Sequence, residues 1–173
     1  MATVLHILLP HFLKLPQTLD TLDVDKVATQ GSAPNFDTVA DAVKTMATML
    51  ADEPVQAAGC TFLADFHRKT NRHSTDKLTT LQEINVIVAA LHAHRSSVDV
   101  QHQGCRALLN ITCNDNNKVR VAKRDGIETI LAAMKTHRSS ENVQQYGCRA
   151  LVNLAFSPNN QVTIAAGAAL KRL

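Results

Sequence analysis

The sequence contains no tryptophan, and aromatic residues make up only 3% of its 173 positions. β-Strands are enriched in aromatic and β-branched residues. This chain instead draws heavily on Ala, Leu, Asn and Gln, and Ala, Leu and Gln are good helix formers. The composition therefore favours helices over strands. Hydrophobic residues at 45% and charged residues at 19% are typical of one globular domain with a sizeable core.

The chain also lacks a strong charge of either sign and any pattern typical of an active site. Its formal net charge is +3, and no dense stripe of Lys and Arg indicates a surface that follows phosphates. No nucleophile beside a base, acid/base pair, glycine-rich phosphate loop or metal-ligand spacing stands out. The sequence therefore predicts no enzyme activity, no catalytic residue, no cofactor and no bound metal.

The four cysteines form no CxxC pair, so the spacing of a zinc site is missing. They are Cys60, Cys105, Cys113 and Cys148, and we expect all four to be small buried residues in a reducing compartment. Because Cys60, Cys105 and Cys148 stand one repeat apart, we expect no disulfide among these three. The cytoplasm is the expected location, with the nucleus as the alternative. His94 and His137 recur at equivalent places because the sequence is duplicated, so their pairing does not indicate a metal site.

No apolar run is long enough for a membrane span. The stretch 1–15 is apolar, but it is shorter than the ~20 residues a membrane helix needs and Pro10 interrupts it. No basic residue precedes it and no cleavage site of small residues follows, so we expect neither a membrane contact nor a secretory signal. Residues 1–35 are predicted to form a helical or irregular segment that covers the first repeat. The alternative is a segment produced by an imperfect gene model.

An internal repeat is the strongest signal in the sequence. The segment Val100–Ile111 recurs as Val143–Leu154, 43 residues later, and the register holds across the whole unit. A weaker copy of its first half begins at Val55, 45 residues earlier. A fixed period of this length indicates stacked helical units. The predicted repeats span 36–83, 84–126 and 127–166, with a partial unit at 167–173.

Each unit reads as three helices. Residues 117–124 are predicted as a short first helix, and the Asp125-Gly126 pair as a sharp turn, in which the glycine is able to take the positive φ that such turns often need. The second helix carries an apolar stripe at Ile127, Ile130, Leu131 and Met134. Ser140 is the expected N-cap of a third helix. That helix should bury Val143, Gly147, Ala150, Leu151 and Leu154, with Gly147 at a close helix contact.

The third-helix segments resemble the armadillo repeat family. The family pattern is close to Val-Gln-x-x-Ala-x-Trp-Ala-Leu-x-Asn-Ile-Ala, and 100–112 and 143–155 follow it nearly position for position. The resemblance covers about 36–173 and is closest over 84–168. It implies an all-α fold, a right-handed α-solenoid of three-helix repeats wound into an alpha-alpha superhelix. It also implies an intracellular scaffold that binds an extended peptide in a concave groove.

In this family an asparagine holds the peptide backbone and a tryptophan four residues earlier shapes the side-chain pockets. By position the asparagine corresponds to Asn110 and Asn153, while the tryptophan is replaced by Arg106 and Arg149; the first repeat has Thr61 and Asp65. Guanidinium groups pair with carboxylates and phosphates, so an acidic or phosphorylated partner is expected. The predicted peptide-binding residues are Gln103, Arg106, Asn110, Tyr146, Arg149 and Asn153. The alternative is that the arginines are merely solvated and the asparagines bridge neighbouring repeats.

The predicted function is thus a protein–protein interaction scaffold, and the alternative is a nucleic-acid-binding helical repeat. A nucleic-acid-binding repeat would need a continuous basic surface, and the acidic Asp65 in the first repeat argues against that alternative. We expect Leu108 and Leu151 in the core, and Arg106 and Arg149 exposed.

At the C-terminal end, Gly167 is expected to take the place of the turn glycine, with a second helix starting at 168. The apolar Ile164, Leu170 and Leu173 there predict further repeats or self-association.

Overall fold

The computed structural model describes residues 34–71 and 81–169, and every regular element within these ranges is an α-helix. The helices are α2 (Val39–Thr48), α3 (Glu53–Asn71), α4 (Leu81–Ala93), α5 (Val98–Ile111), α6 (Asp115–Ala122), α7 (Gly126–Thr136), α8 (Glu141–Ala155) and α9 (Pro158–Ala169). The all-α prediction is confirmed for this part of the chain. The predicted N-terminal segment, apart from its last two residues, and residues 170–173 lie outside the described ranges. None of the described helices is long and apolar enough to cross a membrane.

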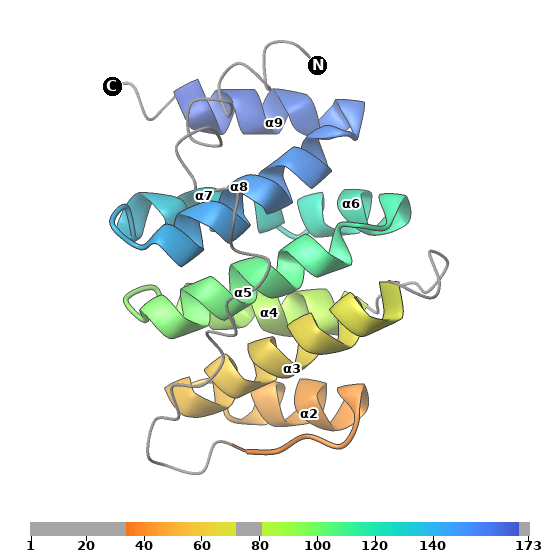
Figure 1. Cartoon of the computed structure of the whole chain (residues 1–173), viewed down its shortest axis with the longest axis vertical. Coiled ribbons are helices and arrows are strands. Elements are labelled where there is room, and N and C mark those ends of the chain that lie inside the picture. Colours follow the sequence, from red (N-terminus) through yellow and green to blue (C-terminus); the bar gives the residue numbers. More distant parts are fainter. Residues whose placement is uncertain (1–33, 72–80, 170–173) are drawn as a thin grey trace.

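The helices form two rows that run the length of the molecule. In Figure 1, α3, α5 and α8 lie one above another in front, and α2, α4 and α7 lie behind them. Each front helix packs on the helix that precedes it in the chain, so α2/α3, α4/α5 and α7/α8 are hairpins stacked in sequence order. The short helix α6 lies beside the second and third hairpins, and α9 packs on α7 and α8 at the end of the stack.

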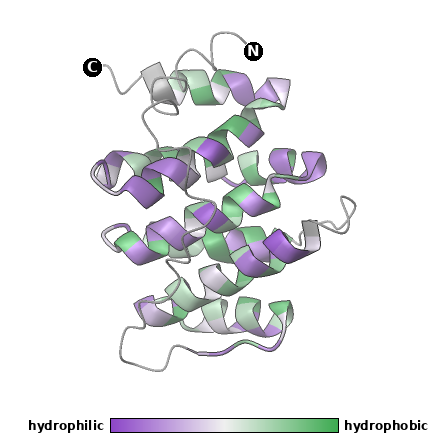
Figure 2. Cartoon of the chain, in the orientation of Figure 1, coloured by the Kyte–Doolittle hydropathy of each residue, from purple (hydrophilic) through white to green (hydrophobic). Residues whose placement is uncertain are grey.

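The apolar stripes predicted from the sequence point into the space between the two rows. Ile127, Ile130, Leu131 and Met134 are all buried, and so are the predicted core positions of α8. Leu108 and Leu151 have no exposed surface, as expected. In Figure 2 hydrophobic residues gather on α4, at the centre of the stack. One continuous apolar core therefore runs through all three hairpins.

The two helices of each hairpin make a close contact at a glycine on the front helix. Gly59, Gly104 and Gly147 stand at equivalent positions, and each meets a large side chain thirteen residues earlier in the chain. A Cβ atom on Gly104 would lie 2.5 Å from Leu91 Cδ2, and one on Gly147 would lie 2.7 Å from the Met134 Cγ. The predicted close contact at Gly147 is confirmed, and it recurs in all three hairpins.

A glutamine ties the back helix of each hairpin to the front helix, and it is buried in the first two hairpins and partly buried in the third. Gln101 Nε2 donates to the carbonyl oxygens of Leu91 at 2.8 Å and His94 at 3.1 Å, at the C-terminal end of α4. Gln56 and Gln144 make the same two bonds in their hairpins, at the same sequence separations. Carbonyls in the last turn of a helix have no partner within the helix, so the glutamine satisfies groups that burial would otherwise leave unbonded.

Replacing this glutamine should weaken the hairpin without changing its shape. Gln101→Met keeps a similar length but removes the amide donor, and Gln101 is only 2% exposed. We expect a loss of about 1–2 kcal/mol in the free energy of unfolding, because a buried carbonyl loses its partner. Urea denaturation followed by circular dichroism measures it, with the exposed Gln82→Met as the matched control. Equal midpoints for the two variants would contradict this role.

The turn between α6 and α7 differs from the prediction. Asp125, not Gly126, has the positive φ, at 57°, and Gly126 begins α7. A Cβ on Gly126 would lie 2.4 Å from Val121 Cγ1 and 2.8 Å from its carbonyl oxygen, so this glycine is required by close approach of the backbone. Asp tolerates the left-handed region better than most residues. The helix before the turn also starts two residues earlier than predicted, at Asp115.

The predicted turn at Gly167 is wrong. Helix α9 continues through Gly167 to Ala169, so there is no break at which a second helix begins at 168. A Cβ at Gly167 would lie 2.4 Å from Leu131 Cδ1. The glycine therefore lets α9 approach α7 rather than ending the helix. Ile164, in the middle of α9, is fully buried.

Candidate functional site

The front helices α3, α5 and α8 carry equivalent residues at equivalent places. Asp65, Asn110 and Asn153 form one row along the stack, and Thr61, Arg106 and Arg149 form a second row one helical turn earlier. We call the surface made by these six residues, together with Gln103 and Tyr146, the third-helix face. It contains all six residues predicted from the sequence to bind a peptide.

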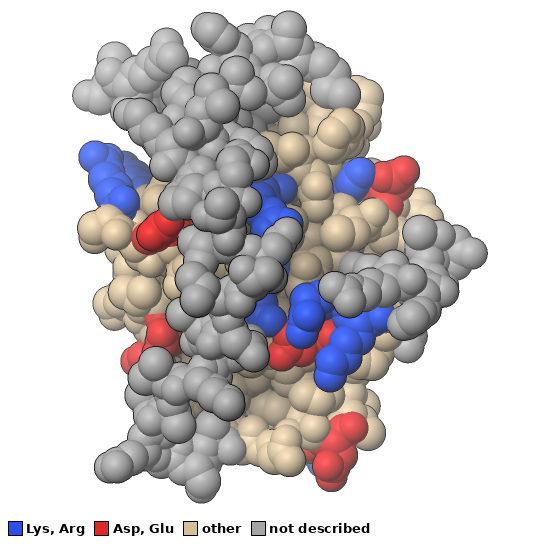
Figure 3. Space-filling view, viewed as in Figure 1, with Lys and Arg blue, Asp and Glu red and all other residues tan. Residues whose placement is uncertain are grey.

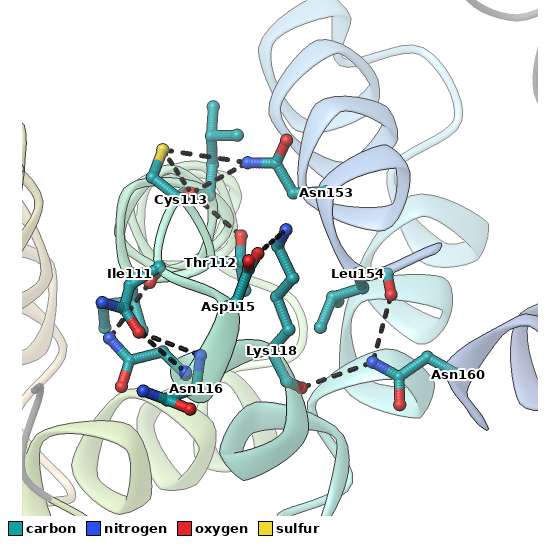
Figure 4. A network of polar contacts seen from close by, with 12 residues as sticks. Ile111, Thr112, Cys113, Asp115, Asn116, Lys118, Asn153, Leu154 and Asn160 are labelled. Carbon is teal, nitrogen blue, oxygen red and sulfur yellow. Dashed lines mark hydrogen bonds and ion pairs between the residues drawn. The ribbon is translucent and has the colours of Figure 1, made fainter. Parts of the chain in front are cut away.

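The two asparagines connect neighbouring front helices. Asn110 Nδ2 donates to the Ala64 carbonyl oxygen on α3 at 2.9 Å. Asn153 Nδ2 makes the equivalent bond to the Leu109 carbonyl on α5 at 3.4 Å and also contacts Cys113 Sγ at 3.8 Å (Figure 4). The structure thus places both side-chain amides between repeats, which was the alternative considered for them.

Arg106 is buried rather than exposed, and this prediction was wrong. Its side chain is only 9% exposed, and its Nη2 donates to Asp65 Oδ1 at 2.5 Å. Its Nη1 donates to Gln103 Oε1 at 3.1 Å. Asp65 also faces Arg68 Nη2 at 3.4 Å on its own helix. Charge compensation by Asp65 is what allows a guanidinium group to be buried here.

Arg149 occupies the same place one repeat later and differs in both respects. Its side chain is exposed. No described carboxylate lies within ion-pair distance of Arg149. The residue on α5 that is equivalent to Asp65 on α3 is Asn110, which carries no charge. Two homologous arginines on one surface therefore have different charge environments.

The aromatic member of the third-helix face also spans two repeats. Tyr146 stacks on His102 of α5, with ring centroids 5.1 Å apart and an interplanar angle of 28°. In Figure 3, Lys and Arg atoms gather over the middle of this side of the molecule, with acidic atoms directly beside them. Asp65 stands among the arginines of the third-helix face, so its basic residues do not form an unbroken row.

Several residues that join the repeats were not identified from the sequence as structural. His94 Nε2 and His137 Nε2 each donate to a carbonyl of the preceding repeat at 2.7 Å, to Leu50 and Arg95 respectively. Asn160 Nδ2 reaches the carbonyls of Lys118 and Leu154 (Figure 4). The signal was available, because each histidine recurs at the same place in its unit. Ser97 and Ser140, in the loops beside them, cap α5 and α8 as predicted for Ser140.

The cysteines divide into three buried thiols and one exposed thiol. Cys60, Cys105 and Cys148 are buried and free, as predicted, whereas Cys113 is exposed. Burial raises the pKa of the Cys60 and Cys105 thiols to about 12, and the neighbouring cysteine adds to the shift. Partial burial also raises the pKa of Cys113, while Lys118, Arg149 and a hydrogen bond from Asn153 act in the opposite direction.

Thiol chemistry should reveal this division. The thiolate is the reactive form, so burial and a raised pKa both protect a cysteine. With a disulfide reagent at mildly alkaline pH, we expect one fast-reacting thiol in the native protein and four in denaturant. Cys113→Ser should abolish the fast reaction. Any fast-reacting thiol in the native Cys113→Ser variant would contradict the burial of Cys60, Cys105 and Cys148 in the core.

Among the described residues, no group of three or more His, Cys, Asp and Glu side chains is placed to hold a metal ion. Comparison with known proteins gives no match for this chain, whether among protein-family models, curated proteins or solved structures. The argument for function therefore depends on the geometry of the third-helix face.

Proposed function

We propose that the chain is an armadillo-type right-handed α-solenoid whose function is to bind other proteins, with an extended acidic peptide lying across the third-helix face. The observation that carries the proposal is the repeated register of the front helices. The bonds from Asn110 to Ala64 and from Asn153 to Leu109 join equivalent atoms in successive repeats. The same chemical positions therefore recur along one surface.

The spacing of such a surface suits an extended peptide. Packed helices lie about 8–10 Å apart, and an extended chain advances about 3.3 Å per residue. One repeat then corresponds to about three peptide residues. The span from α3 to α8 covers two such spacings, so a peptide of about six to nine residues would cross all three front helices.

The charges on this face favour an acidic protein segment over nucleic acid. Nucleic-acid binding depends on many cations that follow the phosphates. Here the third-helix face contains Asp65, which pairs with both Arg106 and Arg68, so a carboxylate interrupts the cations of the face. A single acidic side chain of a peptide can lie beside Arg149. A continuous row of phosphates would also lie beside Asp65, which carries the same sign of charge.

In this proposal the residues of the face have separate roles. The amides of Asn110 and Asn153 already bind carbonyl oxygens, so these residues fix the spacing between helices. Arg149 and Tyr146 contact the peptide directly. Gln103 and Arg106 form the equivalent part of the face in the second repeat.

Fluorescence anisotropy with labelled nine-residue peptides tests the proposal. We expect the full chain to bind an acidic peptide saturably and a basic peptide of the same length much more weakly. A labelled single-stranded RNA and a DNA duplex form the second arm. Tighter binding of either nucleic acid, with an affinity that falls linearly in the logarithm of salt concentration, would favour the alternative function. The absence of binding by every peptide would refute the proposed peptide-binding function.

A further inference from the structure

The two arginines of the third-helix face differ because of a single residue in the row beside them. Arg106 lies against Asp65, and its charge is compensated inside the protein. Arg149 lies in the next repeat, where the residue equivalent to Asp65 is Asn110. The front helices pack in the same register in both places, as the equivalent Asn110 and Asn153 bonds show. The difference in charge therefore follows from the chemistry of this row and not from a change in packing.

We infer that Arg149 is the site at which the face selects a partner, by binding one carboxylate side chain of an extended peptide at the junction of α5 and α8. This inference depends on the proposed peptide-binding function and assigns its specificity to one repeat. Arg106 takes no part in selecting charge, because Asp65 already occupies its guanidinium group. Asp65 thus occupies the anion position beside Arg106, whereas the equivalent position beside Arg149 has no carboxylate from the described part of the chain.

The structure itself shows which group fits an arginine at this place. Asp65 is an Asp carboxylate held at 2.5 Å from the Arg106 Nη2 in the junction of α3 and α5. A Glu or Asp side chain from a peptide would supply the same group at the next junction. Charged hydrogen bonds of this kind are roughly twice as strong as neutral ones. At that junction Asn110, whose Nδ2 donates to Ala64 on α3, stands where Asp65 stands at the first junction and brings no carboxylate.

One further cation, Lys118, lies near this junction, and its charge is already paired with Asp115. The charges of Arg149 and Lys118 both reach Cys113 and act to lower its pKa, so both lie near the C-terminal end of α5. Lys118 is held by Asp115 at 2.5 Å and lies over the Phe156 ring at 5.3 Å from its centroid, so its position is fixed. Asp115 is the only described carboxylate paired with either cation, so of these two cations it is Arg149 that has no described carboxylate partner.

The test compares three nine-residue labelled peptides that differ only at the central position, which is Glu, Gln or phosphoserine. For the wild-type chain we expect the Glu peptide to bind about tenfold more tightly than the Gln peptide, as one charged hydrogen-bonded pair would give. Arg149→Gln should remove this preference. Lys135→Gln, which removes an exposed cation from α7 outside the third-helix face, should leave it unchanged. If the phosphoserine peptide bound and the Glu peptide did not, the assignment to a carboxylate would be wrong.

Exchanging Asp and Asn at positions 65 and 110 gives a reciprocal test. Asn110→Asp places beside Arg149 the carboxylate that Asp65 supplies to Arg106, so it should abolish the preference for Glu. Asn110→Ala is the matched control, since it also removes the bond to Ala64 but adds no charge, and it should keep the preference. Asp65→Asn should leave Arg106 without its carboxylate and strengthen binding of a peptide with two Glu residues three positions apart. Thermal melts monitored by circular dichroism establish that each variant is folded.

The outcomes separate the two levels of the argument. If no peptide binds to the wild-type chain, the proposed function fails and this inference fails with it. If the Glu and Gln peptides bind equally well, the face binds peptides but Arg149 does not select them. If Arg106→Gln removes the preference and Arg149→Gln keeps it, the anion position lies in the other repeat. The last two results overturn this inference alone.

Discussion

Leu151→Ala is expected to lower the free energy of unfolding by about 2–5 kcal/mol, the usual range for a buried leucine. Leu151 is on the front helix α8 and has no exposed surface, and its side chain packs between the front row and the back row of helices. The substitution removes three carbon atoms from a close-packed region, and the surrounding helices relax only in part. Because the core is continuous, the loss should appear as a lower denaturation midpoint of the whole cooperative unit.

The control is Arg149→Ala, two residues earlier on the same helix. Arg149 is exposed and has no carboxylate partner among the described residues, so we expect a change within about 0.5 kcal/mol. Urea denaturation of the two variants and the wild-type chain measures both effects. If Leu151→Ala left the midpoint unchanged while Arg149→Ala lowered it, the inward and outward faces of α8 would be reversed.

Local sequence signals predicted the helices well because they depend on neighbouring residues. The spacing of Ile127, Ile130 and Met134 predicts one apolar face, and all three are buried. Ser140 before Glu141 predicts a helix start, and the Ser140 Oγ accepts from the Val143 amide. These features need only residues within seven positions of each other, so a single sequence contains them in full.

The burial of Arg106 could not be predicted in the same way. Its partner, Asp65, lies 41 residues away on another helix, and the five residues centred on Arg106 and on Arg149 are identical. Both segments read Gly-Cys-Arg-Ala-Leu. The information was in the alignment of the repeats, since Asp65 stands where the later repeats have asparagine. Using it requires knowing which rows of the stack come into contact.

Glycines were misjudged for a related reason. A glycine near a helix end was interpreted as a turn at both Gly126 and Gly167, yet neither has a positive φ. Each lies close to another part of the chain instead, Val121 in one case and Leu131 in the other. The shorter spacing before Gly167 than before Gly126 was the only sequence sign that α9 would continue. Close approach between helices is a property of the packed structure and not of the local segment.

The close contact within each hairpin leads to the second large expected effect. Gly104→Leu should destabilise the protein by about 3 kcal/mol, because overpacking in a dense core forces neighbours from their preferred conformations. Even the first added atom would lie 2.5 Å from Leu91 Cδ2 and 2.8 Å from its Cγ. Leu91 is 1% exposed and is packed into the core, so it has little space into which to move. The exposed Ala132→Leu on α7 adds a similar volume at the surface and should change stability by less than about 0.5 kcal/mol.

A double-mutant cycle identifies the cause of this effect. Leu91→Ala alone should cost about 2–5 kcal/mol, since it leaves a cavity beside Gly104. When Gly104→Leu is added, the new side chain enters that cavity, so the double variant should be more stable than the sum of the single effects predicts by about 1–3 kcal/mol. Chemical denaturation of the four proteins gives the coupling energy. Strictly additive losses would mean that Gly104 and Leu91 do not meet, and the hairpins would then be closed by a different contact from the one that recurs at Gly59 and Gly147.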